Sequence, residues 1–207
     1  AFTAGAPPPA AILRKMAEME FEVMQVYGLT ETYGHVTQCV WREEWNDLSF
    51  DEQADLQSWQ GVSFPMHEGA AVMDTETGEM VPRDGETQGE IVLRGNAVMK
   101  GYYRNEAATA ESLRDGWFFS GDAAVWHENG YIQIKDRLKD VIISGGENIS
   151  SVEVEGYLYR HPAVAAAAVV AKPDETWGEV PCAFVELKPG ESVGEAEFLD
   201  WCRGQMA

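Results

Sequence analysis

The chain has 207 residues, of which 45% are hydrophobic and 11% aromatic, and it carries a net charge of −20. This composition supports a sizeable core and argues against global disorder, and the length allows one large or two modest domains. The acidic charge and the lack of a basic run argue against nucleic acid as a partner. No apolar run approaches the roughly 20 residues of a transmembrane helix, so no membrane-spanning segment is expected.

The first 60 residues are expected to form the edge of an α/β layer. The three prolines after Gly5 predict a rigid turn, because proline fixes φ and removes a hydrogen-bond donor. Helical spacing over 10–19 and a short strand over 21–27 follow. Residues 41–60 fit no single period and are interpreted as an irregular or helical excursion.

From residue 61 to 137 the pattern changes to short alternating runs separated by turn signals, which predicts an antiparallel β subdomain. A helix over 106–114 interrupts these strands. The expected strands span 69–74, 89–94, 117–119, 123–127 and 131–134.

A charged break at Asp136–Asp140 separates this subdomain from a smaller unit. Four charged side chains in five residues are too polar to be buried inside one sheet, so the break is expected where two folded units meet. A turn at Ser144–Gly146 follows, and the rest predicts an α+β unit. Its strands are expected at 140–143, 164–171 and 180–187, and its helices at 151–160 and 195–202.

Both ends of the sequence look cut. The chain has no initiator methionine and opens as if in mid-strand, and it stops inside a helical pattern. We therefore expect a piece of a longer chain. The cysteines Cys39, Cys182 and Cys202 lie far apart, which suits a reduced, cytoplasmic protein better than a disulfide framework.

Tyr27–Glu31 is a candidate ligand-binding stretch. It places an aromatic ring, Gly28, a hydroxyl and a carboxylate at the end of a strand, where ligands bind in open α/β sheets. The ring could cover a flat base, Thr30 could bond a phosphate, and Glu31 could hold Mg²⁺, which prefers hard oxygen ligands. A tight turn with a capping threonine explains the same residues.

Ser120–Asp122 and the loop at Trp177 are weaker candidates. An aspartate after a glycine could accept hydrogen bonds from ribose hydroxyls, although an ordinary β-turn has the same composition. Trp177 could line a tunnel or cap the core. Gly145 and Gly146 could let the backbone approach a narrow ligand or could serve only a turn. No phosphate-binding P-loop motif is present in this sequence.

Taken together and in this order, these motifs resemble the adenylate-forming superfamily, which includes acyl-CoA synthetases, peptide-synthetase adenylation domains and luciferases. The resemblance implies the end of a large AMP-binding domain (1–137), with an α/β edge (1–60) and the antiparallel subdomain (61–137). A small α+β lid domain, truncated, follows (138–207). The ligands implied are ATP, Mg²⁺, CoA and a small carboxylate, and a homodimer is left open.

The resemblance also implies residue roles. The strand Gly89–Ile91 matches the family's GEI motif. The nucleotide-binding residues would be Gly5, Ala6, Pro7, Tyr27, Gly28, Thr30, Asp122 and Arg137. Among them Thr30 meets the α-phosphate, and Asp122 binds the ribose hydroxyls with Arg137 beside it. Glu31 would be the metal ligand, and Lys139 the hinge about which the lid rotates between two half-reactions.

The glycine turn resembles the acyl-CoA ligase branch, in which Gly145, Gly146, Glu147 and Trp177 would border the channel for CoA. The loop Thr32–His35 is similar to that of medium-chain acyl-CoA synthetases and methylmercaptopropionate-CoA ligases. The implied reaction joins a fatty acid or other carboxylate to ATP to give acyl-AMP, which the CoA thiol then attacks. The family's phosphate loop and its catalytic lysine are not in this sequence, so the chain alone is expected to be inactive. The alternative is a non-catalytic module that binds nucleotide, CoA or a partner protein.

Overall fold

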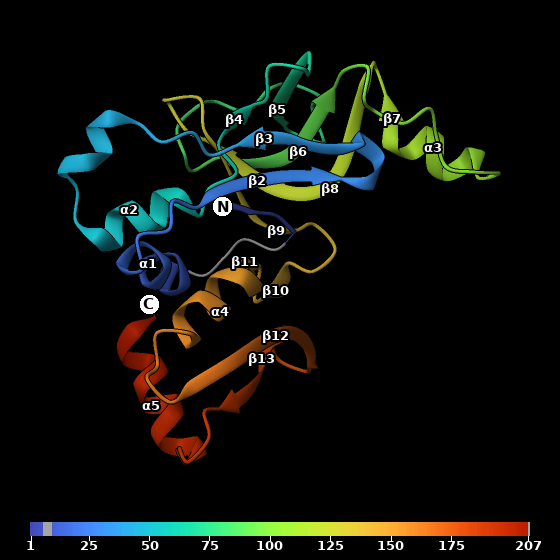
Figure 1. The fold of residues 1–207 in the computed structure, drawn as a ribbon. Coiled ribbons are helices and arrows are strands. Elements are labelled where there is room, and N and C mark those ends of the chain that lie inside the picture. The colour runs from blue at the N-terminus through green and yellow to red at the C-terminus, as the bar shows by residue number, and fades with distance from the viewer. Residues whose placement is uncertain (6–9, 207) are drawn as a thin grey trace. The chain divides into compact units, whose positions relative to one another are not determined.

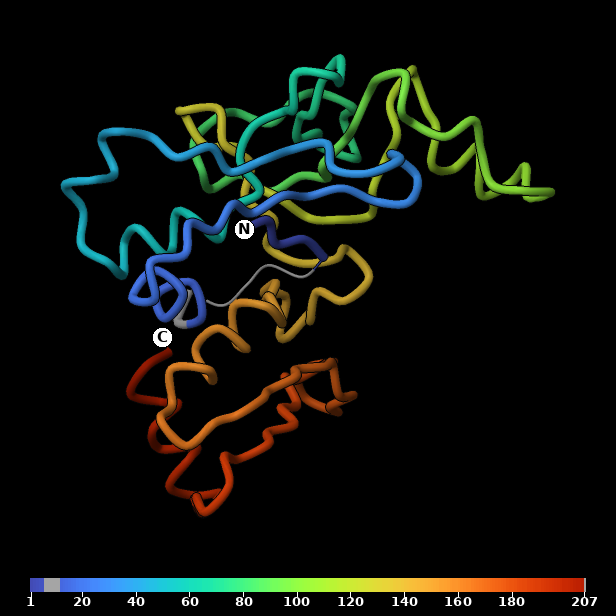
Figure 2. Tube along the Cα trace, in the orientation of Figure 1, coloured from blue at the N-terminus to red at the C-terminus, as the bar shows by residue number. Residues whose placement is uncertain are grey.

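The chain folds into two compact units, Ala1–Leu138 and Lys139–Ala207. A computed structural model describes residues 1–5 and 10–206. Figure 1 shows the elements of each unit, and Figure 2 traces the chain through them. None of the helices in the described residues has the length and hydrophobicity of a membrane-spanning helix.

The first unit contains two sheets. The smaller sheet has the order β1-β2-β3-β4, with β1 and β2 parallel and the remaining pairs antiparallel. Its strands are β1 (Phe2–Thr3), β2 (Met24–Leu29), β3 (Gly34–Gln38) and β4 (Val62–Ser63). Its helical segments are α1 (Ala10–Glu18), η1 (Thr30–Thr32), η2 (Glu43–Asp47) and α2 (Phe50–Gln57). The helix α1 lies between the parallel strands in sequence, as a crossover connection requires.

Helix α2 shows why residues 41–60 fit no single period. A short 3₁₀ segment precedes the helix, and the change of helical pitch breaks the hydrophobic spacing. The helix begins at a capping box. The Ser49 hydroxyl accepts from the Glu52 amide, and the Glu52 carboxylate accepts from the Ser49 amide. The expected helical excursion is therefore confirmed.

The larger sheet is antiparallel and has the order β5-β6-β8-β7, with β9 paired to β8. Its strands are β5 (Gly69–Met73), β6 (Gln88–Arg94), β7 (Leu113–Arg114), β8 (Trp117–Trp126) and β9 (Ile132–Arg137), and α3 (Glu106–Ser112) precedes β7. Side chains from β2, β3, β5, β6, β8 and β9 share one buried core, so the two sheets pack on each other. This packing brings the end of β2 beside β8.

Strand β8 corrects the sequence prediction. Two strands separated by a turn at Ser120–Asp122 were expected, but one strand runs through all ten residues. Three residues of β8 stand opposite the single residue Ile91 of β6, which is a bulge. Gly121 has φ +81°, the left-handed region that favours glycine, so the local sequence looks like a turn.

The charged break is a second correction. Asp136 and Arg137 belong to β9, and Asp136 is buried with 3% of its surface exposed. The Arg137 amide donates to the Asp136 carboxylate at 2.7 Å, which satisfies part of the buried charge. The segment outside any strand begins only at Leu138, and its charged residues are Lys139 and Asp140.

The second unit has the sheet order β11-β10-β13-β12 with two helices. Its elements are β10 (Ile142–Ser144), β11 (Glu147–Ile149), α4 (Ser151–Leu158), β12 (Val164–Asp174), β13 (Gly178–Leu187) and α5 (Glu195–Gln205). Ile142, Leu158 and Val169 form its buried centre. Strand β11 was not predicted, because three residues are too few to show an alternating pattern.

Candidate functional site

The strand β2 delivers the candidate stretch into a tight turn. Beyond Leu29 the chain makes one 3₁₀ turn, and the Thr32 hydroxyl accepts from the Leu29 amide at 3.0 Å. The capping threonine of this turn is thus Thr32, which is buried, whereas Thr30 is exposed. The turn leaves the Thr30 side chain at the surface, available to a ligand.

Tyr27 does not present its ring as the sequence predicted. Only 6% of the residue is exposed, and its ring packs in the shared core of the two sheets. Its hydroxyl donates to Oδ2 of Asp122 at 2.7 Å. Burial, followed by the charge of Asp122, raises the pKa of Tyr27 well above its ordinary value. Tyr27 is therefore a neutral donor that fixes Asp122, and it offers little surface for a base to cover.

The bulge in β8 sets the position of Asp122. The Ser120 hydroxyl donates to the Ile91 carbonyl at 2.7 Å, and the Gly121 amide donates to Oε1 of Glu90 at 2.7 Å. Burial raises the pKa of Glu90, and the neighbouring charge of Asp122 adds to the rise. These bonds hold the residues before Asp122 against β6, so the carboxylate projects from a rigid element.

Arg137 stands directly across from Asp122 in the β8–β9 ladder. Its Nε lies 3.7 Å from Oδ1 of Asp122, and 60% of the Arg137 side chain is exposed against 10% of the Asp122 side chain. The pair thus joins a fixed, nearly buried acid to a cation that reaches into solvent. An acid held in this way can accept hydrogen bonds from a diol while the cation faces an anionic group.

Glu31 lies one residue beyond Thr30 and is bonded from another part of the unit. The Tyr102 hydroxyl donates to Oε1 of Glu31 at 2.9 Å, and the Met99 amide donates to the Glu31 carbonyl at 2.7 Å. Tyr102 was not singled out from the sequence. Because 71 residues separate it from Glu31, no local pattern could have indicated the contact.

The remaining nucleotide-site predictions are Gly5, Ala6 and Pro7. Gly5 is exposed with φ +99°. Ala6 and Pro7 lie outside the described residues.

In the second unit, the structure brings Gly145 and Trp177 together. The Gly145 amide donates to the Trp177 carbonyl at 2.9 Å, and a Cβ at Gly145 would come within 2.7 Å of the indole. Gly145 and Gly146 form the two-residue loop of the β10–β11 hairpin, with φ of +61° and +91°. Trp177 is 57% exposed, so it is not a cap on the core. Glu147 is exposed beside this loop.

Lys139 is exposed and is the first residue of the second compact unit. It lies in a turn, Leu138–Asp140, between β9 and β10. The Leu138 amide donates to the Gly121 carbonyl at 2.8 Å, which fixes the chain up to the residue before Lys139.

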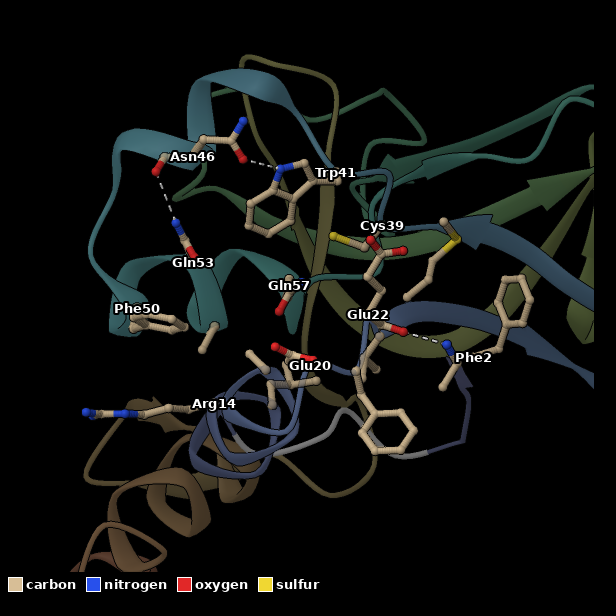
Figure 3. Close-up of a pocket in the computed structure, with 17 residues that line it drawn as sticks. Phe2, Arg14, Glu20, Glu22, Cys39, Trp41, Asn46, Phe50, Gln53 and Gln57 are labelled. Carbon is tan, nitrogen blue, oxygen red and sulfur yellow. Dashed lines mark hydrogen bonds between the residues drawn. The ribbon is translucent and has the colours of Figure 1, made fainter.

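A cavity of ≈ 730 Å³ lies between α1, α2 and the beginnings of β1 and β2. Figure 3 shows its lining, in which Phe2, Trp41 and Phe50 supply aromatic surface. Arg14, a cation that lines it, is paired with Asp51 at 2.8 Å. Of the predicted site residues that the structure describes, none lines this cavity, so its position does not support a nucleotide site there.

Comparison with known families gives two matches along the chain. Residues 1–103 match the family described as AMP-binding enzyme, and residues 153–207 match its C-terminal domain.

Two plant proteins illustrate the sequence similarity. The chain is 56% identical over 209 residues to "Acetate--CoA ligase CCL3" of Humulus lupulus, a match that covers 99% of this chain and 37% of that protein. It is 58% identical over 186 residues to "Acetate/butyrate--CoA ligase AAE7, peroxisomal" of Arabidopsis thaliana, covering 90% of this chain and 33% of that protein. The chain thus spans about a third of the length of these relatives.

The fold is similar to that of o-succinylbenzoate CoA synthetase (MenE) from Bacillus subtilis. The structure of that enzyme with its acyl-adenylate intermediate matches with a TM-score of 0.82 at 32% identity, covering 100% of this chain and 39% of that one. The same enzyme in complex with ATP and magnesium ion matches with a TM-score of 0.80 at 32% identity, covering 100% and 40%. The predicted mixed α/β and α+β fold is confirmed.

Proposed function

We propose, because this chain belongs to the family of adenylate-forming AMP-binding enzymes, that it is part of an ATP-dependent carboxylate–CoA ligase. The ligase would join a carboxylate to ATP to give acyl-AMP and pyrophosphate, and the CoA thiol would then displace AMP. The observation that carries the proposal is the cluster of Tyr27, Asp122 and Arg137 at the end of β2. Strand β2 meets the consecutive strands β8 and β9 there, although 95 positions separate Tyr27 from Asp122, and Thr30 and Glu31 follow at the end of β2.

In this function Asp122 accepts hydrogen bonds from the ribose hydroxyls, and Arg137 lies beside the same sugar. Tyr27 holds the acid in place, while Gly28 and the Gly5–Pro7 segment border the adenine. Thr30 meets the α-phosphate. The support for these roles is that Asp122 is fixed from two sides, whereas Thr30 and Arg137 are exposed.

Glu31 fits Mg²⁺ that enters with ATP. Magnesium in proteins is usually held by one or two carboxylates, with phosphates and water completing its shell. Among the described residues, no group of three or more His, Cys, Asp or Glu side chains could hold a metal by itself. A single carboxylate beside the proposed phosphate position matches this chemistry. Bound Mg²⁺ would offset negative charge on the phosphates.

The second unit would supply the CoA site and the moving part. We assign residues 1–137 to the AMP-binding domain and 138–207 to the lid, which the compact units Ala1–Leu138 and Lys139–Ala207 support. The loop Gly145–Glu147 would border the pantetheine arm together with Trp177. An open position at Gly146, where a Cβ would touch nothing within 4 Å, leaves room for a narrow ligand.

We propose a short-chain acid as the substrate. The loop Thr32–His35 favours a medium-chain or methylmercaptopropionate ligase, but two relatives more than half identical are named for acetate and butyrate. A panel of carboxylates from two to ten carbons, assayed for AMP release in the full-length ligase, separates these alternatives. The three free cysteines support a reducing compartment, and the cytoplasm is our proposal, although one relative's name places it in the peroxisome. A homodimer is left open.

The function is tested with the full-length ligase and the 207-residue chain in parallel. With ATP, Mg²⁺, acetate or butyrate, and CoA, the full-length ligase should release one AMP and one pyrophosphate per thioester formed. The 207-residue chain should form no acyl-AMP. The cationic residues with which members of the family stabilise the negative charge of the transition state are not in its sequence. Pyrophosphate release coupled to the carboxylate is the measurement.

Turnover by the 207-residue chain would contradict the expected inactivity of this chain alone, because it would show that the reaction needs none of the residues the chain lacks. A second outcome would contradict the ligase function itself. Tight ATP or CoA binding by a full-length ligase that never releases pyrophosphate would favour the non-catalytic module instead. Calorimetry with ATP and with CoA, run on the same samples, distinguishes that module from a protein that binds neither.

The hinge role of Lys139 predicts unequal effects on the two half-reactions. Lys139→Pro in the full-length ligase should slow one half-reaction about tenfold more than the other, because proline fixes φ and obstructs lid rotation. Pyrophosphate exchange reports the first step, and thioester formation from supplied acyl-AMP reports the second. Lys139→Ala, which leaves the backbone free, is the matched control and should affect both steps far less. Equal losses in Lys139→Pro would count against the hinge.

A further inference from the structure

The segment between β6 and α3 is fastened to the turn that carries Glu31. Two contacts make the attachment, one to the backbone and one to the side chain of the same residue. The Met99 amide donates to the Glu31 carbonyl at 2.7 Å, and the Tyr102 hydroxyl donates to the Glu31 carboxylate at 2.9 Å. The turn η1 is therefore held from outside its own sheet.

Tyr102 is itself fixed to the first turn of α3. Its amide donates to Oγ1 of Thr109 at 2.9 Å, and that hydroxyl donates to the Asn105 carbonyl at 2.7 Å. Asn105 also caps the helix by accepting from the Ala108 amide at 3.1 Å. Gly101, with φ +149°, packs so closely that a Cβ would lie 2.6 Å from Thr109. The ring thus starts from an anchored backbone.

This arrangement leaves the Glu31 carboxylate bonded at one oxygen. Tyr102 donates to Oε1, and among the described residues it is the side chain that bonds this carboxylate. A phenol donates but adds no negative charge, so it can orient the carboxylate without repelling an anionic ligand. No described residue hydrogen-bonds the other oxygen, Oε2, which can therefore face a cation.

We propose that Tyr102 is a positioning residue that holds Glu31 in the orientation in which it binds the Mg²⁺ of ATP. The inference rests on the proposed function, since it takes Glu31 as the metal ligand. Without the phenol, the Glu31 side chain would have to be ordered at the moment of binding. Ordering one flexible side chain corresponds to a loss of about 3- to 10-fold in affinity.

The chain offers a matched control next to Tyr102. Tyr103 is 86% exposed, and its ring contacts the Arg104 guanidinium at 5.2 Å and lies outside the Glu31 contact. Tyr102→Phe and Tyr103→Phe each remove one hydroxyl from the same loop. Only Tyr102→Phe should change how the metal contributes to ATP binding.

The experiment is calorimetric titration of ATP into the full-length ligase without acid, once with Mg²⁺ and once with EDTA. Tyr102→Phe should weaken binding about 3- to 10-fold with Mg²⁺ and leave binding in EDTA unchanged. Tyr103→Phe should match the wild type in both conditions. Glu31→Gln should remove the effect of Mg²⁺ on ATP affinity. The double variant Glu31→Gln with Tyr102→Phe should then bind ATP as tightly as Glu31→Gln alone.

If Tyr102→Phe weakened ATP binding equally in Mg²⁺ and in EDTA, the inference would be overturned, because the hydroxyl would then serve only the folding of the loop. Wild-type affinity in Tyr102→Phe would overturn it as well. If the wild type shows no Mg²⁺-dependent ATP binding, the proposed function fails together with the inference. Thermal melting of each variant confirms that the measured samples are folded.

Discussion

Asp122→Asn in the full-length ligase should reduce kcat/KM for ATP by about 100-fold, most of it through KM, because two hydrogen bonds to a charged group are weakened. The amide has one acceptor oxygen where the carboxylate has two, and the Tyr27 hydroxyl already takes one acceptor position, so fewer positions remain for the ribose hydroxyls. It also removes the charge that faces Arg137 at 3.7 Å. Steady-state kinetics with ATP as the varied substrate give the measurement.

Tyr27→Phe separates the positioning of Asp122 from its direct role. The variant keeps the ring in the core but removes the hydroxyl that donates at 2.7 Å. It should cost about tenfold in kcat/KM for ATP, less than Asp122→Asn, because Gly121 is still held by Glu90. An unchanged KM for ATP in Asp122→Asn would show that Asp122 does not contact the nucleotide.

Gly28→Ala should destabilise the first unit by more than about 3 kcal/mol, the range reached when a substitution forces the backbone to move. A Cβ at Gly28 would lie 2.0 Å from the Gly34 carbonyl oxygen and 2.6 Å from the Cα of His35. Both neighbours are backbone atoms, so no side chain can rotate away. Because Tyr27, Thr30 and Glu31 flank this position, nucleotide binding should be lost together with the fold of the turn.

The matched control for this substitution is Gly156→Ala. Gly156 lies in α4, where a Cβ would meet no other atom within 4 Å, and the variant should gain about 1 kcal/mol from the better helix propensity of alanine. Chemical denaturation followed by fluorescence reports both variants. A Gly28→Ala protein with wild-type stability and ATP affinity would show that the turn is more adaptable than its geometry indicates.

Most secondary structure could be predicted from the sequence wherever a single period persists. Helix α1 keeps a helical spacing over its nine residues, and β6 holds an apolar run bounded by turn signals; the positions of both are confirmed. The errors fall where a residue that is typical of turns or loops lies inside a strand. Gly121 suggested a turn but makes a bulge inside β8, and Asp136 suggested a break but is buried in β9.

The site was predictable in its parts but not in its internal contacts. Tyr27 and Asp122 were both candidates, but their hydrogen bond joins residues 95 positions apart, and a sequence pattern carries no information about such a distance. The same limit hid Tyr102. The burial of Tyr27 depends on the packing of two sheets, so a ring at the end of a strand could be read as exposed.

The bond from Leu138 to Gly121 has a thermodynamic consequence for the proposed ligase. The Leu138 amide is tied to the residue before Asp122, and Lys139 follows immediately. A nucleotide that shifts the bulge in β8 therefore acts on the first residue of the linker. Binding free energies are reciprocal. If ATP shifts the second unit toward one orientation, the protein in that orientation binds ATP more tightly, by the same factor. Binding and release of the nucleotide would in this way change the preferred orientation of the second unit without any contact from the acyl group.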